Sequence, residues 1–380
     1  MAERKARIAH VTWTFGGTQE GISRSVTELA RDQARWGDVT VICARAEAGP
    51  ENVRIVPVDL NILERRLPFS LGFAAASRRA LRRAGPFDIV HAHVPTLFRA
   101  DVATVHLFPP RRLIAMVRDT LSRTNQPLPD DVRKRLRFVG LTDWTYRRNM
   151  GPPTRLIAVS DRVADALASE YALERSSITT VPLGISAPPG PAASVKRPQG
   201  ARRVALFVGH QYVTKGLGFV IDALAGLGAD APHLVVIGEG SEGSRRAMED
   251  YARTRGVAHL IRFDGVQPSV WDYYAMADFL IYPTFFDTFG LVIGEALASG
   301  CPVITTKAAG ISDLLQSSPA LRIMDHADDV AALMDAIQAL APKTEVRETA
   351  IAGVASLICE KHSKAVANIY NTILKQTKRR

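Results

Sequence analysis

The chain has 380 residues but only three cysteines and no long hydrophobic run. Cys43, Cys301 and Cys359 lie far apart, without a C-x-x-C pair or a neighbouring histidine cluster, which argues against a disulfide framework and a structural zinc site. This cysteine usage favours a reducing compartment, which we expect to be the cytoplasm. No stretch of about 18 apolar residues occurs, so we expect no transmembrane helix, and the charged residues 1–8 do not predict a signal peptide.

What the chain does have is apolar residues, at 47% of the sequence against 23% charged. This composition excludes a disordered chain. The length is about twice that of a typical domain, so we expect two hydrophobic cores and two domains.

Positive charge is concentrated in one segment. The formal net charge is +10, and residues 61–160 hold 18 Lys and Arg against 7 Asp and Glu, so the rest of the chain is close to neutral. Such a patch attracts anionic lipid, nucleic acid or a phosphorylated substrate, although a solvated helix face explains it equally well. No nucleic-acid-binding motif accompanies the charge, so we expect no nucleic acid partner.

Short β-rich runs alternate with helical patterns along the whole chain, which indicates α/β structure with mostly parallel sheets covered on both faces. Strands are predicted at residues 6–12, 39–43, 53–58, 88–91, 103–106, 156–159, 203–208, 233–237, 261–263, 279–282 and 302–305. Helices are predicted to contain residues 22–30, 78–83, 111–124, 217–227, 245–255, 270–277, 291–298 and 363–374.

Residues 186–200 are rich in Ala, Pro, Gly and Ser and predict a linker. We therefore expect two doubly wound Rossmann-like domains, at residues 1–187 and 200–362. Because ligands of such sheets bind at the carboxyl ends of the strands, we expect the site in a cleft between the domains.

Two glycine-containing turns follow predicted strands in the second half. After residue 208, Gly209 to Gly216 includes His210 and Lys215 and leads into a helix, a combination that suits a phosphate although it is not a Walker A loop. Gly238 and Gly240 follow the next strand, without the third glycine of a dinucleotide fingerprint. Tight turns explain both segments as well as ligand binding does.

The most specific pattern spans residues 282–304. Asp287 is expected in the loop after a strand, and Glu295 lies eight residues later inside the next helix. The N–H groups of Gly290 and Leu291 lie between them at the helix start, so one element offers carboxylates for sugar hydroxyls and amides for phosphate. An N-cap aspartate followed by an incidental helix glutamate is the alternative interpretation.

These motifs together resemble the retaining glycosyltransferases of family 4, which have the two-domain GT-B fold. The resemblance runs nearly end to end and rests on residues 16–17, 88–93, 104–106, 157–160, 181–185, 208–216, 238–240, 263–265 and 287–304. It implies transfer of a sugar from a nucleoside diphosphate sugar to a hydroxyl acceptor with retention of configuration, without a cofactor and without a metal ion. It also implies that the helix within residues 363–380 crosses back to the first domain.

The resemblance assigns the diphosphate to Lys215 and to the amides of Gly290 and Leu291, and it places Gly216 and Gly238 among the donor-binding residues. It adds His210 as an assistant, and it implies that Gly17 closes over the diphosphate from the first domain. His210 stands near the position where many members have an arginine, so Lys215 is expected to carry more of this role.

The sugar itself is assigned to two candidate catalytic residues. The resemblance implies that Asp287 binds the donor sugar hydroxyls and that His106 lines the cleft beside that sugar, although a buried structural histidine explains His106 as well. It assigns the ribose to Glu295. Asp287 stands where the family usually has Glu, which shortens the carboxylate by one methylene group.

In the GT-B arrangement the first domain holds the acceptor, which places the basic segment 61–160 on the acceptor side. Residues 111–124 combine a face of Leu113, Ile114 and Val117 with arginines, as interfacial helices do. We expect a glycan or glycolipid acceptor of the lipid-linked or lipopolysaccharide type in cell-envelope synthesis, and peripheral association with the inner face of an anionic membrane. A non-catalytic or regulatory GT-B-like subunit and a nucleotide-sugar epimerase or phosphorylase on the same fold are the competing functions.

Overall fold

The computed structural model describes residues 4–16, 21–47, 49–60, 69–124, 139–150, 154–190, 195–238, 240 and 242–377. The chain divides into two compact units. The first unit comprises Met1–Arg118, Pro127–Gly184 and Cys359–Arg380, and the second comprises Asp119–Gln126 and Ile185–Ile358. Among the described residues, no helix has both the length and the apolar character needed to cross a bilayer.

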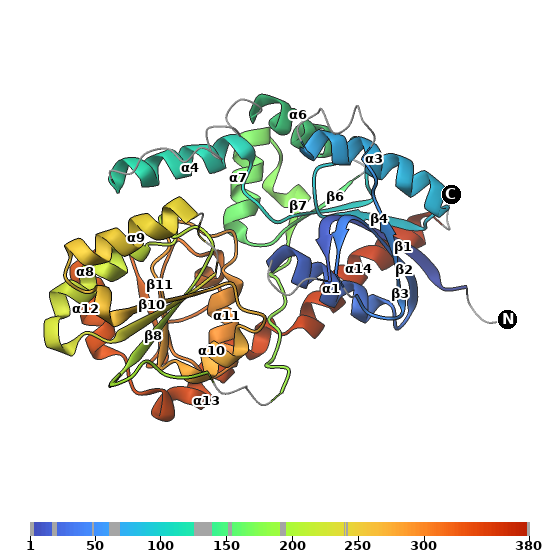
Figure 1. Ribbon diagram of the computed structural model, residues 1–380. Helices are drawn as coiled ribbons and strands as arrows, with labels where there is room; N and C mark the ends of the chain where they lie inside the picture. The colour runs from blue at the N-terminus through green and yellow to red at the C-terminus, as the bar shows by residue number, and fades with distance from the viewer. Residues whose placement is uncertain are drawn as a thin grey trace. The chain divides into compact units, whose positions relative to one another are not determined.

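The first unit is built on a seven-stranded parallel sheet with the order β3-β2-β1-β4-β5-β6-β7 (Figure 1). Its strands are β1 (Ala6–Phe15), β2 (Gly37–Ala46), β3 (Val53–Pro57), β4 (Ile89–Ala92), β5 (Val102–Val105), β6 (Arg155–Ala158) and β7 (Ile178–Thr180). Its helices are α1 (Gly21–Gln33), α3 (Phe69–Ala84), α6 (Val139–Asn149), α7 (Asp161–Tyr171) and α14 (Cys359–Thr377), with the greater part of α4 (Pro110–Arg123).

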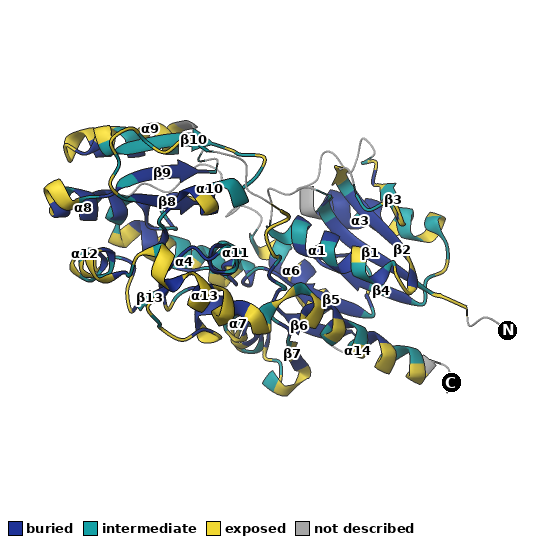
Figure 2. Ribbon diagram, turned by 90° about the horizontal axis from the view of Figure 1, so that it is seen from below, coloured by how far each residue is buried: buried dark blue, intermediate teal, exposed yellow. Residues whose placement is uncertain are grey.

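Two apolar clusters cover the two faces of this sheet. Ile8 of β1 packs in a cluster that includes Val26 of α1 and Tyr370 of α14. Val11 of the same strand packs in the other cluster, with Phe73 of α3. Because successive side chains of a strand point to opposite faces, both faces of the sheet must be apolar and covered, as the buried strands in Figure 2 show.

The second unit has a six-stranded parallel sheet with the order β10-β9-β8-β11-β12-β13. Its strands are β8 (Val204–Val208), β9 (His233–Ile237), β10 (Ile261–Gly265), β11 (Phe279–Tyr282), β12 (Val303–Thr306) and β13 (Leu321–Met324). Its helices are α8 (Leu217–Leu227), α9 (Glu242–Thr254), α10 (Trp271–Met276), α11 (Leu291–Ala298), α12 (Val330–Ala339) and α13 (Lys343–Val354). All residues of β8 and β11 are buried, which makes these two strands the centre of the core.

The expectation of two doubly wound parallel sheets is confirmed. The helix predicted at residues 78–83 is the end of the longer α3, and the C-terminal helix begins at Cys359 rather than at residue 363. The strands β7 and β13 were not predicted. Each is short and lies at the edge of its sheet, where a hydrophobic run is not required.

Candidate functional site

The strand order of the second unit reverses between β8 and β11, which lie side by side in its sheet. Ligands of open α/β sheets bind at the carboxyl ends of the strands at such a reversal. The loops that follow these strands, residues 209–216 and 283–290, contact each other, since the Phe285 N–H donates to the Thr214 carbonyl at 3.0 Å. The two most informative sequence motifs therefore meet at one point of the fold.

Gly216 allows the two loops to approach this closely. Its φ of 81° lies in the left-handed region, and a Cβ atom there would lie 2.2 Å from the Pro283 carbonyl oxygen. Any other residue would push the loop after β8 away from the loop after β11. Gly216 thus acts through the backbone, and it is the residue from which α8 starts.

Lys215 and Asp287 form an ion pair between these loops. The Lys215 Nζ donates to Asp287 Oδ2 at 2.6 Å and to the Phe286 carbonyl at 3.2 Å. The Tyr282 hydroxyl donates to the same carboxylate oxygen at 2.7 Å, and the Phe289 N–H donates to Oδ1 at 3.1 Å. The Lys215 and Asp287 side chains are 15% and 17% exposed, so the pair is largely shielded from water.

The electrostatics of this cluster keep Asp287 ionised. Burial by itself raises the pKa of Asp287, but the charge and hydrogen bond of Lys215, together with the bonds from Tyr282 and Phe289, hold that pKa below its ordinary value. Burial and the neighbouring Asp287 raise the pKa of the Tyr282 phenol well above its ordinary value. At neutral pH the cluster is a lysine cation, a carboxylate and a neutral phenol.

The N-terminus of α11 lies next to Asp287 in the chain. Gly290 is the N-cap, with a φ of 94°, and as a glycine it makes no side-chain cap hydrogen bond. The first N–H groups of a helix have no intrahelical partner and carry the positive end of the helix dipole. The Gly290 and Leu291 backbone is therefore suited to bind an anion.

Glu295 lies in the second turn of α11 and is almost fully buried, with 1% of its surface exposed. The hydroxyl of the equally buried Tyr274 donates to Glu295 Oε2 at 3.3 Å. Tyr274 belongs to α10, so this contact joins α10 to α11.

Gly238 and His210 lie at the ends of β9 and β8. Gly238 has a φ of 105°, and a Cβ atom there would lie 2.4 Å from the Gly209 carbonyl oxygen, so this glycine permits close packing of the two turns. The Tyr212 hydroxyl donates to the Gly238 carbonyl at 3.1 Å. The His210 side chain is exposed.

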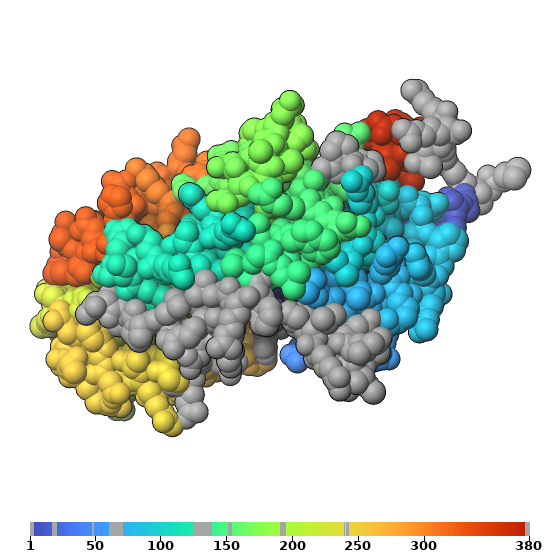
Figure 3. Space-filling model, turned by 90° about the horizontal axis from the view of Figure 1, so that it is seen from above, coloured from blue at the N-terminus to red at the C-terminus, as the bar shows by residue number. Residues whose placement is uncertain are grey.

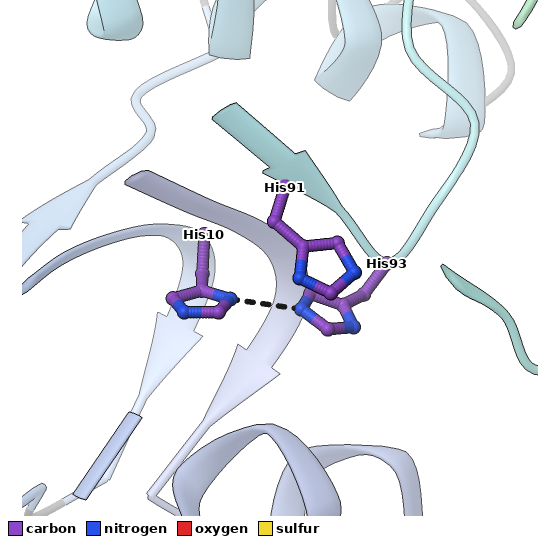
Figure 4. A group of neighbouring side chains, drawn as sticks. All are labelled: His10, His91 and His93. Atoms are coloured by element: carbon purple, nitrogen blue, oxygen red, sulfur yellow. Dashed lines mark hydrogen bonds between the residues drawn. The ribbon is translucent and has the colours of Figure 1, made fainter. Parts of the chain in front are cut away.

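The strand order of the first unit reverses between β1 and β4, and histidines gather there (Figure 4). His10 of β1 pairs in register with His91 of β4, and His93 follows the end of β4. His10 Nδ1 lies 2.9 Å from His93 Nε2, and His93 Nδ1 lies 3.1 Å from Nε2 of His106, which follows β5. All four side chains are buried.

Burial keeps these imidazoles neutral. It lowers the pKa of His10 to about 4 and that of His106 to about 3, and it lowers the pKa values of His91 and His93 well below the ordinary value. His106 also lines a small cavity of about 30 Å³ within the first unit, together with Trp13, His93, Tyr146 and Asn149.

The first half of the chain matches the family described as Glycosyltransferase Family 4 over residues 20–187, and the second half matches Glycosyl transferases group 1 over residues 202–342. A D-inositol 3-phosphate glycosyltransferase of Nocardiopsis dassonvillei is 30% identical over 337 residues, covering 78% of this chain and 76% of that protein. The chain belongs to the family 4 glycosyltransferases.

Further relatives agree with this membership. The lipopolysaccharide core biosynthesis mannosyltransferase LpsB of Rhizobium meliloti is 27% identical over 269 residues, covering 65% of this chain and 76% of that protein. Among solved structures, WaaG, a glycosyltransferase involved in lipopolysaccharide biosynthesis, superposes with a TM-score of 0.74 at 20% identity, over 96% of this chain and 99% of that chain. Anabaena Alr3699/HepE in complex with UDP-glucose superposes with a TM-score of 0.66 at 14% identity, over 97% and 100%. The fold of this glycosyltransferase is accordingly GT-B.

The structure brings together five of the ten site residues predicted from the sequence of this glycosyltransferase. Lys215, Gly216, Asp287, Gly290 and Leu291 meet at the reversal of the second sheet. Gly17 lies outside the described residues.

Sequence reasoning missed two groups of partners. The strand pattern places Tyr282 at the end of a strand and gives no sign that its hydroxyl donates to Asp287. His10 and Gln33 were not singled out either. The signal for His10 is its strand position, since residues 8, 10 and 12 share one face of β1 and a polar side chain there must find a buried partner.

Among the described residues, His10, His91 and His93 form a group whose ligand atoms lie close enough for one metal ion. Every ring nitrogen of the three already has a hydrogen-bond partner: Gln33, Tyr370, Thr104 or another histidine. The His91 and His93 rings lie 4.1 Å apart with a tilt of 32°. We interpret the group as a hydrogen-bonded network.

Proposed function

We propose that this glycosyltransferase moves a sugar from a nucleoside diphosphate sugar to a hydroxyl acceptor with retention of configuration, without a metal ion or another cofactor. The observation that carries the donor part is the Lys215 cation beside the N-terminus of α11, at the carboxyl ends of β8 and β11. A solved neighbour of the same fold is in complex with UDP-glucose.

The leaving diphosphate gains negative charge as the glycosidic bond breaks. Lys215 and the Gly290 and Leu291 amides provide a cation and fixed dipoles for that charge, which lowers the barrier because they are already in place. Gly238 and Gly216 permit the close backbone approach in this region, and His210 is a further donor at its edge.

Asp287 has a further role toward the donor sugar in this proposal. Its Oδ2 already accepts two hydrogen bonds and its Oδ1 accepts one, so the carboxylate is held in one orientation and keeps acceptor capacity for a sugar hydroxyl. Glu295 accepts from the ribose and His106 faces the donor sugar. The Tyr274 bond to Glu295 fixes the orientation of that side chain.

The test of the donor site is a transfer assay that measures released nucleoside diphosphate across a panel of nucleotide sugars. Lys215→Met keeps the length of the side chain and removes its charge, and we expect kcat to fall about 100-fold, as when one preorganised donor is removed. Lys307→Met is the matched control, because Lys307 also pairs with an aspartate, Asp325, but on an exposed surface of the same unit. Unchanged turnover of Lys215→Met would contradict the assignment.

Three alternatives predict other outcomes. A non-catalytic subunit would bind a nucleotide sugar, measured as a thermal shift, but would release no diphosphate with any acceptor. An epimerase would produce free epimerised sugar, and a phosphorylase would require inorganic phosphate. Proton NMR of the anomeric centre in the product tests retention, and full activity after chelation tests metal independence.

For the acceptor, we propose a lipid-linked or lipopolysaccharide-type glycan at an anionic membrane surface in cell-envelope synthesis, reached from the cytoplasmic side. Of the basic segment 61–160, the described helices α4 and α6 lie on the face seen in Figure 3. The side chains of Arg111, Arg112, Arg147 and Arg148 are exposed. Trp144 of α6 is 48% exposed with Arg148 stacked on its ring, a combination found at membrane interfaces.

Co-sedimentation with liposomes at low salt tests this surface. We expect binding to vesicles that contain anionic lipid and little binding to neutral vesicles, and we expect Arg147→Glu with Arg148→Glu to weaken it more than the same changes at Arg245 and Arg246 of α9. Equal binding to both vesicle types would contradict the membrane proposal and leave the donor-site proposal intact.

A further inference from the structure

A line of hydrogen bonds runs through the interior of the first unit from Gln33 at the end of α1 to His106 after β5. Gln33 Oε1 lies 2.7 Å from His10 Nε2, His10 Nδ1 lies 2.9 Å from His93 Nε2, and His93 Nδ1 lies 3.1 Å from His106 Nε2. Within the described chain, the Nδ1 atom of His106 is buried and has no hydrogen-bond partner. The line therefore ends on one unused nitrogen.

Neutral imidazoles make such a line directional. A neutral imidazole has one N–H donor and one bare acceptor nitrogen, so the tautomer of one ring determines the tautomer of the next. Burial lowers the pKa values of His10, His93 and His106, and none of these rings is protonated at neutral pH. The direction of the whole line is thus decided at its first member, Gln33.

The orientation of the Gln33 amide sets that direction. Its oxygen lies 2.7 Å from His10 Nε2, whereas its amide nitrogen is buried without a hydrogen-bond partner in the described part of the chain. The Tyr370 hydroxyl lies 2.6 Å from His91 Nδ1, outside this line. His10 then donates to the Gln33 oxygen, His93 donates to His10, and His106 donates to His93, which leaves the Nδ1 of His106 as a bare acceptor.

We propose that Gln33, His10 and His93 are positioning residues that hold His106 in the tautomer whose Nδ1 accepts a hydrogen bond from a hydroxyl group of the sugar substrate. His106 lines a cavity of about 30 Å³, which has room for about one water-sized group. A hydroxyl group fits this space and a whole sugar ring does not.

Asn149 also lines the cavity, but its polar atoms are occupied. Its amide nitrogen donates to the Thr96 and Thr145 carbonyls, and its oxygen accepts from the Thr96 hydroxyl. Among the described residues, His106 Nδ1 is a buried acceptor without a donor, which is destabilising, and a bound hydroxyl at this cavity would satisfy it. The assignment of that hydroxyl to a sugar substrate rests on the proposed glycosyl transfer, whereas the tautomer of His106 does not.

The tautomer is tested in the free protein by ¹⁵N NMR with labelled histidine, with His106→Gln used to assign the His106 signals. We expect wild-type His106 to carry its proton on Nε2. Gln33→Met keeps the side-chain length but removes the acceptor, and should give His106 a mixture of tautomers. Tyr370→Phe removes a buried hydroxyl from the His91 branch and should leave His106 unchanged. A wild-type proton on Nδ1, or an unaltered tautomer in Gln33→Met, would overturn the positioning role.

Transfer kinetics test the substrate contact separately. Loss of one well-placed hydrogen bond predicts a fall in kcat of about 3- to 10-fold for Gln33→Met, with a smaller change in the donor KM. Tyr370→Phe should lower the melting temperature about as much as Gln33→Met does, but its kcat should stay within about twofold of the wild-type value. If the tautomer shifts as expected but kcat does not fall, the hydroxyl contact is wrong. If no transfer is found with any donor, the tautomer measurements still test the positioning role.

Discussion

The ion pair between Lys215 and Asp287 should contribute measurably to stability as well as to donor binding. The Lys215 Nζ lies 2.6 Å from Asp287 Oδ2, and the side chains are 15% and 17% exposed. Breaking a fully buried pair costs about 3–5 kcal/mol and an exposed pair contributes about 0–1 kcal/mol. For this intermediate burial we expect a coupling free energy of about 2 kcal/mol.

A double-mutant cycle measures this coupling without confusing it with other losses. The cycle comprises Lys215→Met, Asp287→Asn and the double variant, each analysed by thermal unfolding. Both single variants should melt at lower temperature than the wild type, since each leaves one polar group shielded and unpaired, and the double variant should lose less than the sum. Two neutral side chains of similar size replace the pair in the double variant.

The exposed pair of Lys307 and Asp325 is the internal control. Its cycle, Lys307→Met with Asp325→Asn, should show no measurable coupling, because water screens both groups. A coupling at residues 215 and 287 no larger than that of the control would refute the argument that burial makes the first pair strong.

The pH dependence of the coupling is a second check on the same pair. The pKa of Asp287 is lowered in the folded protein, so its contribution is fully present above the unfolded value of about 3.9 and is lost as pH falls through the folded value. The coupling should therefore be constant from neutral pH down to about pH 5 and disappear in stronger acid. A coupling that is lost near pH 6 would point to a histidine rather than to Asp287.

Three further outcomes are expected. Gly216→Ala should destabilise the second unit and abolish donor binding, because its Cβ would meet the Pro283 carbonyl, whereas Gly218→Ala has open space and should melt near the wild-type temperature. Lys343→Met removes three hydrogen bonds to carbonyl groups at the end of α10 and should cost about 2 kcal/mol in thermal unfolding, with Lys343→Arg costing less. His10 and His106 have lowered pKa values in the folded protein, so below about pH 6.5 the unfolded chain binds more protons than the folded chain. The free energy of unfolding should therefore decrease as the pH is lowered, by up to about 1.4 kcal/mol per pH unit for each histidine. A free energy of unfolding that is independent of pH between 4 and 6.5 would contradict their burial.

Much of the fold was predictable because its signals are local. The strands β8, β9 and β11 are apolar runs of four or five residues bounded by turn residues, and each is buried on both faces. The edge strands β7 and β13 were not predicted, since a strand of three or four residues carries little periodicity and an edge position tolerates polar side chains. The helices α12 and α13, after the last predicted strand, were also not predicted.

The sequence by itself determined two doubly wound sheets, the turns that follow their strands and the residue types needed at a donor site. Only the tertiary structure decided that Lys215 contacts Asp287 across 72 positions of the chain, and that Gln33, His10, His93 and His106 form one hydrogen-bonded line. The physical reason is the strand order: the sheets place β8 beside β11 and β1 beside β4, and no local pattern specifies which side chains meet where those strands end.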